Sequence, residues 1–306
     1  MEENRQKIII DTDIGDDIDD AFALALAVHS PELELVGITT VFRNSEIRAK
    51  IAKALLSSYG REDIPVCAGM DIPLLQEFSD RDNDIFDDKG RLIPCQYDCD
   101  IMKDFMAEAE WGPDFIIRSI LENPGQITLI PIGPLTNVAA AIRKCPEIVS
   151  KIKKIVLMGG AFHEDFPEWN ILCDPEAARI VFTSGADIYA VGLDVTMKCR
   201  LTMEQVRQFE ALSSDGSVIL SRMMKSWFEH YRFECPVLHD PLTVGCVINP
   251  SFVVFRQQEI LVDLMEGERG KTRMVSSPEK GSSGIWIAES VEASEYLSFF
   301  RERVFT

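Results

Sequence analysis

Short apolar runs alternate with longer helical segments along most of the chain. Six runs rich in β-branched and other apolar residues predict strands, at residues 7–11, 35–41, 64–68, 127–132, 154–158 and 188–194. Five segments between them have the residue spacing of helices, at residues 19–30, 45–59, 113–122, 135–144 and 174–183. Strands that are apolar throughout and alternate with helices are typical of a parallel sheet covered on both faces. We therefore expect an α/β fold with a mostly parallel, Rossmann-like central sheet and helices on both faces.

Two regions depart from this alternation. Residues 76–110 contain 11 acidic and 4 basic residues with few periodic apolar positions. They predict an irregular excursion or lid, which is too short for a core of its own. Further on, residues 202–231 return to a helical pattern, residues 258–288 alternate like strands, and residues 291–303 predict a last helix. No boundary between domains is evident, so we expect a single domain over residues 1–306.

The 306-residue chain has 31 Lys and Arg against 50 Asp and Glu, which gives a formal net charge of −19. This balance argues against partners that attract basic surfaces, namely nucleic acids and anionic membranes. No apolar run approaches the roughly 18 residues that a membrane-spanning helix needs, and the first residues lack the apolar core of a signal peptide. The eight cysteines are scattered without a C-x-x-C motif, which is typical of reduced thiols. We therefore expect a cytoplasmic protein without nucleic-acid or membrane partners.

The strongest chemical signal directly follows the first predicted strand. Six aspartates occupy ten positions here, between Asp11 and Asp20, at the end of a strand and the start of a helix. In doubly wound sheets, ligands bind at the carboxyl ends of the strands. Clustered carboxylates repel one another unless a cation joins them, and hard divalent cations prefer oxygen ligands. Helix capping and the helix dipole explain one or two of these aspartates but not six, so the run predicts a divalent-cation site.

Two other kinds of site contain similar aspartates. An EF-hand fits poorly, because Gly15 stands where its spacing requires a ligand and no Glu closes a twelve-residue loop. A phosphohydrolase with a strand-D-x-D motif is a stronger alternative, with Asp11 as nucleophile and Mg2+ as cofactor. Gly15 again counts against it, because such enzymes usually carry Thr or Val at that place.

Further motifs follow the aspartate-rich run in a fixed order. They are GITTV at residues 37–41 with Asn44, IGPLTN at 132–137, VLMGG at 156–160, EWN at 168–170, DPEAA at 174–178 and VLHDPL at 237–242. Together with the strand-D-x-D-x-G…D-D-A pattern of the run, they resemble the inosine–uridine-preferring nucleoside hydrolases from residue 8 to about residue 250. The run departs from the family pattern by two extra residues before its terminal D-D-A and by Ile14 in the usual place of Pro. The resemblance implies the nucleoside hydrolase fold and hydrolysis of ribonucleosides to free base and ribose.

The resemblance also implies a Ca2+ ion and roles for individual residues. The protein ligands of the ion would be Asp13, Asp20, Asp240 and the backbone carbonyl of Ile132, an all-oxygen set that suits Ca2+. Asp13 would take the proton of a cation-bound water, and His239 would protonate or orient the leaving base. The substrate contacts on the sugar side would come from Asp19, Asn44, Met158, Glu168 and Asn170. A homodimer or homotetramer is a further implication of the resemblance.

The sequence leaves two points open. Asp16 and Asp17 fall within the two-residue expansion, and they either add charge around the site or take over the roles of Asp19 and Asp20. The acidic excursion contains no His, although many members of the family have one there near the base. The half of the site that faces sugar and metal therefore looks complete, and the half that faces the base does not. A relative that binds a nucleoside or sugar without turnover is accordingly a further alternative.

Overall fold

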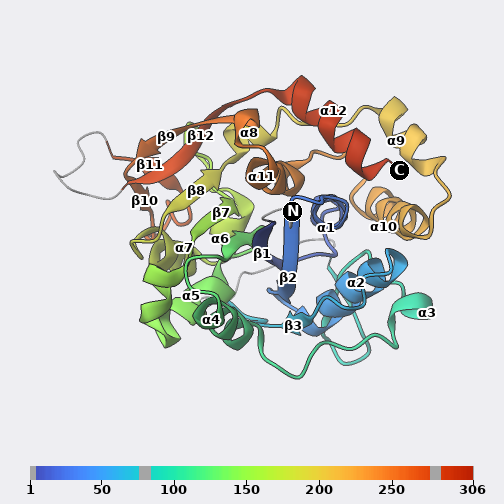
Figure 1. Cartoon of the computed structure of the whole chain (residues 1–306), viewed down its shortest axis with the longest axis horizontal. Helices are drawn as coiled ribbons and strands as arrows, with labels where there is room; N and C mark the ends of the chain where they lie inside the picture. Colours follow the sequence, from blue (N-terminus) through green and yellow to red (C-terminus); the bar gives the residue numbers. More distant parts are fainter. Residues whose placement is uncertain (1–4, 76–83, 276–283, 306) are drawn as a thin grey trace.

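One eight-stranded sheet runs through the computed structural model, which describes residues 5–75, 84–275 and 284–305. Its strands are β1 (Gln6–Thr12), β2 (Leu33–Thr40), β3 (Val66–Ala68), β6 (Thr128–Pro131), β7 (Lys154–Met158), β8 (Ile188–Val191), β9 (Val253–Gln258) and β12 (Ile285–Val291). They lie in the order β3-β2-β1-β6-β7-β8-β12-β9 (Figure 1). Neighbouring strands are parallel except for β12 and β9, which pair antiparallel. The predicted α/β fold with a mostly parallel sheet is confirmed.

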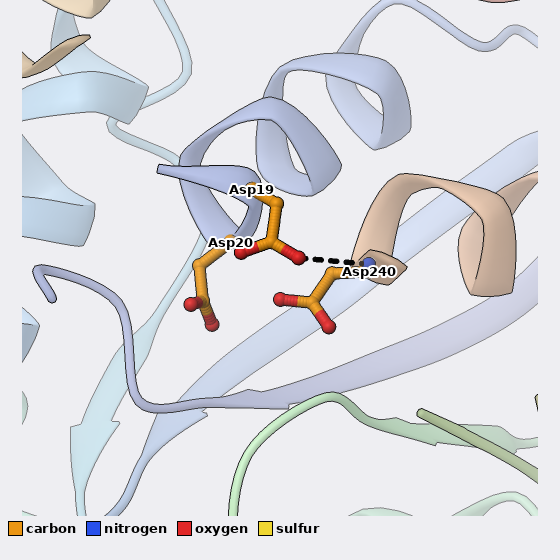
Figure 2. A group of neighbouring side chains, drawn as sticks. All are labelled: Asp19, Asp20 and Asp240. Atoms are coloured by element: carbon orange, nitrogen blue, oxygen red, sulfur yellow. Dashed lines mark hydrogen bonds between the residues drawn. The ribbon is translucent and has the colours of Figure 1, made fainter. Parts of the chain in front are cut away.

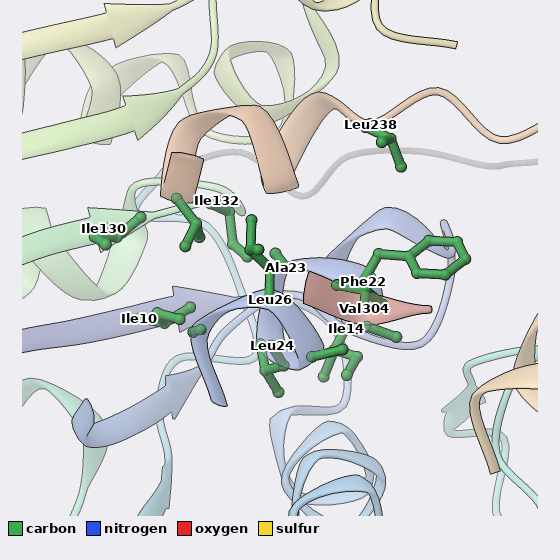
Figure 3. Packing of buried hydrophobic residues seen from close by; sticks show 14 of the residues in the cluster. Ile10, Ile14, Phe22, Ala23, Leu24, Leu26, Ile130, Ile132, Leu238 and Val304 are labelled. Atoms are coloured by element: carbon green, nitrogen blue, oxygen red, sulfur yellow. The ribbon is translucent and has the colours of Figure 1, made fainter. Parts of the chain in front are cut away.

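Helices cover both faces of this sheet and enclose two large hydrophobic cores. The first core involves α1 (Asp19–Val28), α2 (Ser45–Ser58), α10 (Asp215–Tyr231), α11 (His239–Ile248) and α12 (Ala293–Val304). The second involves α4 (Gly112–Glu122), α5 (Thr136–Lys144) and α7 (Pro175–Phe182). Figure 3 shows side chains of β1, β6, α1 and α12 meeting in the first core, among them Ile10, Ile130 and Phe22. Helix α1 is apolar nearly all round because neighbouring elements bury it on almost every side.

The shorter elements connect or flank this framework. They are β4 (Ile85–Phe86), β5 (Leu92–Ile93), β10 (Ile260–Val262), β11 (Thr272–Met274), α3 (Cys99–Met102), α6 (Trp169–Cys173), α8 (Leu193–Thr196), α9 (Met203–Glu210) and the 3-10 helices η1 (Pro146–Lys151) and η2 (Pro250–Phe252). Of the helices in the described residues, none is both long enough and apolar enough to span a membrane.

Some predicted boundaries differ from the structure. The strand predicted over residues 188–194 ends at Val191, because α8 begins directly after Gly192. The helical region 202–231 is two helices, α9 and α10, each with its own capping side chain, Thr202 and Ser214. No element was predicted over residues 239–248, where the structure has α11. Its sequence is rich in β-branched residues and contains glycine, so burial among neighbouring elements outweighs a weak helix propensity.

The acidic excursion at residues 76–110 is described from residue 84 onward; residues 76–83 lie outside the described part. It contains the two-stranded ribbon of β4 and β5 and the four-residue helix α3, with irregular chain between them. It is not fully solvated, since Gln96 and Met102 are each 1% exposed. Part of this segment therefore packs against the body of the protein.

Candidate active site

A cavity of about 420 Å³ opens where β1, β6 and β7 end. Nine of the ten residues predicted for the site line it: Asp13, Asp19, Asp20, Ile132, Met158, Glu168, Asn170, His239 and Asp240. Parallel strands present their carboxyl ends at one edge of the sheet, which explains how distant parts of the sequence meet there.

Three buried carboxylates form one group at this cavity, which we call the acidic trio (Asp19, Asp20 and Asp240). Their ligand oxygens lie within 4.8 Å of one another (Figure 2). The first turn of α1 supplies Asp19 and Asp20, and the first turn of α11 supplies Asp240. The backbone N–H of Asp240 donates to Asp19 Oδ2 at 3.1 Å, and the hydroxyl of Thr12 donates to Asp20 Oδ1. Both helix N-termini favour negative charge at this place.

The acidic trio is electrostatically costly without a counter-charge. Burial raises the pKa of each of the three carboxyls well above its usual range, and repulsion by neighbouring carboxylates raises it further. Only oxygen atoms are offered, and hard divalent cations prefer oxygen ligands. The residues present therefore fit a divalent cation, which agrees with the metal dependence of the family that the sequence resembles.

Asp13 lies beside the acidic trio in a loop with four other residues, which we call the acidic loop (residues 13–17). Its side chain occupies the space over Gly133, where an added Cβ would lie 2.6 Å from Asp13 Oδ1. Burial and then the charge of Asp13 raise the pKa of Glu168, and the charge of Asp13 also adds to the shifts in the trio. Asp20 and Asp240 thus belong both to the predicted ligand set and to the trio. The third member of the trio is Asp19, for which a sugar contact was predicted.

The two expansion residues, Asp16 and Asp17, also line the cavity. The carboxylate of Asp16 forms an ion pair with Arg48 at 2.8 Å. The acidic trio contains Asp19 and Asp20 rather than either expansion residue. The geometry therefore favours the alternative in which Asp16 and Asp17 add charge around the site over the one in which they take over the roles of Asp19 and Asp20.

Glu168 and Asn170 form a polar wall next to Met158. Glu168 caps α6: its carboxylate accepts hydrogen bonds from the backbone N–H groups of Asn170, at 2.8 Å, Gly160 and Ile171, both at 3.1 Å. Burial raises the pKa of Glu168 to about 7 in spite of these donors. The side-chain amide of Asn170 donates to the carbonyls of Ile132, at 2.9 Å, and Met158, at 3.2 Å. This wall is thereby tied to the ends of β6 and β7.

Asn44 lies outside the cavity that holds the other predicted residues. Its Oδ1 accepts from the backbone N–H of Ile47 at 3.4 Å as the N-cap of α2, and its Nδ2 donates to the carbonyl of Leu92 at 2.8 Å. It lines a second cavity of about 430 Å³ instead. A contact between Asn44 and the sugar stays a prediction.

An aromatic pair, which the sequence did not identify, lines the outer part of the cavity. Tyr231 ends α10 and Phe233 follows it after a left-handed residue, Arg232 (φ 56°). The two rings stack with centroids 5.5 Å apart and planes 7° from parallel. The available signal in the sequence was the run of aromatic residues that begins with Trp227 and Phe228. It could not be placed because only the path of the chain after α10 brings these rings to the cavity.

His239 is the first residue of α11, and its Nδ1 lies 2.7 Å from the hydroxyl oxygen of Thr196. Burial and the positive charge of Arg200 lower the pKa of His239 to about 4. The resemblance had implied that His239 protonates or orients the leaving base. With a pKa lowered in this way the neutral imidazole predominates at pH 7, because partial burial and the charge of Arg200 both disfavour the charged form.

Asp11, the nucleophile of the phosphohydrolase alternative, is only 2% exposed and is not among the residues that line the cavity. Its Oδ1 accepts from the hydroxyl of Thr39 at 2.6 Å and from the amide of Asn137 at 2.7 Å. These contacts tie β1 to β2 and α5. Asp11 therefore supports the framework of the site and does not face a substrate.

Comparison with known proteins gives a consistent result. A family model described as inosine-uridine preferring nucleoside hydrolase matches residues 8–298. Probable uridine nucleosidase 2 of Arabidopsis thaliana is 34% identical over 320 residues, which cover 98% of this chain and 98% of that protein. The solved structure of a plant nucleoside hydrolase, the PpNRh1 enzyme, superposes with a TM-score of 0.86 at 31% identity, covering 98% of this chain and 99% of that one. The purine-preferring ribonucleoside hydrolase from Gardnerella vaginalis superposes with a TM-score of 0.85 at 30% identity, covering 98% of both chains.

Proposed function

Since the chain belongs to the inosine–uridine-preferring nucleoside hydrolases, which are hydrolases acting on N-glycosyl compounds, we propose that it cleaves ribonucleosides to base and ribose at a calcium site. The observation that carries the proposal is the acidic trio at the floor of a cavity of about 420 Å³. That volume lies in the usual range of small-molecule sites. Three buried carboxylates in one group serve no packing purpose, so a cation is the simplest reason for them.

In this proposal Asp20 and Asp240 hold Ca2+ together with Asp13 and the carbonyl of Ile132. When bound, the ion would lower the pKa of a coordinated water and help to hold the ribose in place. Asp13 accepts the proton of the attacking water, because it lies beside the trio and lines the cavity. A substrate held in this way has its anomeric carbon next to the proton acceptor, so positioning supplies part of the rate.

The remaining residues of the floor and wall bind the sugar. Asp19, Glu168 and Asn170 present acceptors and donors to its hydroxyls, and Met158 supplies an apolar surface beside them. The backbone N–H groups around Glu168 and the carbonyls around Asn170 hold both side chains in place. Rigid polar groups of this kind stabilise a developing positive charge on the sugar more in the transition state than in the ground state.

The base lies against the outer part of the cavity in this proposal. Tyr231 and Phe233 offer an aromatic surface, and His239, which precedes the proposed metal ligand Asp240 in the chain, lines the same cavity. Because the neutral imidazole predominates, His239 is better suited to orient the leaving base through a hydrogen bond than to protonate it as an imidazolium. Both purine and pyrimidine rings have faces that stack on aromatic side chains. We therefore propose that substrates of both classes are cleaved.

The decisive experiment offers inosine, uridine and a phosphate monoester to the purified protein with CaCl2. Equimolar base and ribose from a nucleoside, with no phosphate from the ester, is the expected result. Phosphate release without base release would overturn the proposal in favour of the phosphohydrolase, although the burial of Asp11 counts against that outcome. Calcium binding without ribose from any of a panel of nucleosides would favour a binding protein. A homodimer or homotetramer belongs to the proposal through the resemblance alone, and a cytoplasmic location through the scattered cysteines.

A further inference from the structure

A buried arginine holds the first half of the acidic loop. Arg48, on α2, is 0% exposed, and its Nη1 donates to the backbone carbonyls of Asp13 and Ile14, the latter at 3.0 Å. Its Nη2 pairs with the carboxylate of Asp16, and its Nε donates to the carbonyl of Phe42 at 2.8 Å in the turn after β2. One guanidinium therefore joins the segments that follow two neighbouring strands.

The acidic excursion holds the second half of the acidic loop. The backbone N–H of Gln96 donates to the carbonyl of Gly15 at 3.0 Å, and its Nε2 donates to those of Asp16 at 3.0 Å and Asp17 at 2.6 Å. Pro94 packs directly on Gly15, where an added Cβ would lie 2.6 Å from Pro94 Cβ. Gly15 also has a φ of 123°, which side chains rarely allow. The loop and the excursion thus fit one another closely.

All five consecutive carbonyls of the acidic loop therefore have a donor that comes from outside the loop. The carboxylates of the same loop, from Asp13, Asp16 and Asp17, line the cavity. These bonds fix the path of the loop backbone beside the cavity, and the pairing of Asp16 with Arg48 fixes one of its side chains as well. The excursion is consequently part of the support of the site, although its composition alone suggested only an irregular excursion or lid.

We propose that Gln96, together with Arg48, is a positioning residue that holds the acidic loop in the geometry required for cation binding. The inference rests on the proposed function, because the cation is the one that the hydrolytic site would use. Neither residue lines the cavity, so each acts through the loop and not on the substrate. Residues that orient metal ligands from outside typically change metal affinity or activity by 10- to 100-fold when replaced.

Gln96→Glu is the sharpest variant because it keeps the shape of the side chain. A carboxylate cannot donate, so it would face two carbonyl oxygens in place of the amide Nε2, while the backbone bond to Gly15 stays. Gln6→Glu is the matched control. The Gln6 amide donates to the carbonyl of Val247 at 2.8 Å, at the end of β1 that lies away from the cavity.

The test is calorimetric titration of chelator-treated protein with CaCl2, alongside thermal unfolding in EDTA. We expect the calcium dissociation constant of Gln96→Glu to rise at least about tenfold, and that of Gln6→Glu to change less than about twofold. Arg48→Lys, which keeps the charge but loses the forked geometry, should weaken binding in the same direction. If Gln96→Glu does not fold by circular dichroism, Gln96→Met removes the same two bonds without adding charge.

The outcomes separate this inference from the proposed function. A wild-type dissociation constant in the folded Gln96 variant, or an equal loss in the Gln6 control, overturns the inference. A wild-type protein that takes up calcium but cleaves no nucleoside overturns the proposed hydrolysis and leaves the positioning role intact. A wild-type protein that takes up no calcium overturns both.

Discussion

Asp20 allows a direct test of the acidic trio, because removing its charge should have opposite effects with and without calcium. The carboxylate is buried, and its ligand oxygen lies within 4.8 Å of those of Asp19 and Asp240. Its Oδ1 accepts a hydrogen bond from the hydroxyl of Thr12, which an asparagine oxygen would also accept. Asp20→Asn therefore removes one negative charge with little change in shape.

The expected magnitudes follow from electrostatics and ligand linkage. Two unit charges 4.8 Å apart repel by about 3 kcal/mol at an effective dielectric constant of about 20. Burial and this repulsion raise the pKa of Asp20, so proton uptake relieves part of the repulsion in the wild type. The free energy of unfolding therefore rises by less than this repulsion energy in Asp20→Asn. Calcium at 100 times its dissociation constant would stabilise the wild-type protein by about 2.7 kcal/mol. For a domain of this size that corresponds to a rise in Tm of about 5 °C.

The assay is thermal unfolding in EDTA and in excess CaCl2. We expect Tm to rise by about 5 °C with calcium in the wild type and by less than about 1 °C in Asp20→Asn. In EDTA the variant should unfold at or above the wild-type Tm. Asp174→Asn is the control, because Asp174 is also buried but accepts from Leu74, Thr136 and Ala177 away from the cavity. It should lose stability in both buffers and keep the calcium shift; a full calcium shift in Asp20→Asn would refute the metal role of the trio.

Three further predictions concern catalysis, substrate binding and pH. Asp13→Asn should lower kcat for base release by about 10²- to 10⁴-fold with an unchanged circular dichroism spectrum, and near-normal turnover would exclude a proton-accepting role. Tyr231→Ala removes one ring of the stacked pair and should raise KM for inosine and uridine about tenfold without changing calcium affinity; an unchanged KM would contradict the base-binding role. Burial raises the pKa of Glu168 from 4.5 to about 7, so its contribution to the free energy of unfolding is fully present below pH 4.5 and is lost as pH rises through 7. The free energy of unfolding of Glu168→Gln, measured with urea, should therefore fall less steeply between pH 4.5 and 7 than that of the wild type. Equal slopes of this free energy against pH would count against a raised pKa of Glu168.

Residue pattern alone predicted most of the sheet and the place of the acidic loop. Apolar runs between helical segments specify buried parallel strands, and the aspartates directly follow one of them. The approach of Asp240 to Asp20 is different, because 220 positions separate them and no local pattern relates them. Only the resemblance placed both in one ligand set.

Local patterns failed where burial or long-range contact decides the structure. Helix α11 is buried on nearly all sides, so its sequence has no polar face that would mark a helix. Gln96 lies among acidic residues that predict an irregular excursion, and its support of the loop is shown only by its contacts with the carbonyls of Gly15, Asp16 and Asp17. A single glutamine with no periodic neighbours gives no signal of this kind in a sequence.

The two halves of the site differ in how the fold builds them. The metal-facing half consists of buried groups at the starts of α1 and α11 and the end of β6, where Asp19, Asp20 and Asp240 are each no more than 4% exposed. The proposed base-facing half depends on the segment after α10, where Phe233 is 54% exposed. Buried charged groups tolerate few replacements, because each must keep its partners, whereas an exposed aromatic can change with little cost to the fold. The proposed metal-facing half is therefore marked by motifs that a sequence displays, whereas the proposed base-facing residues Tyr231 and Phe233 belong to none of these motifs.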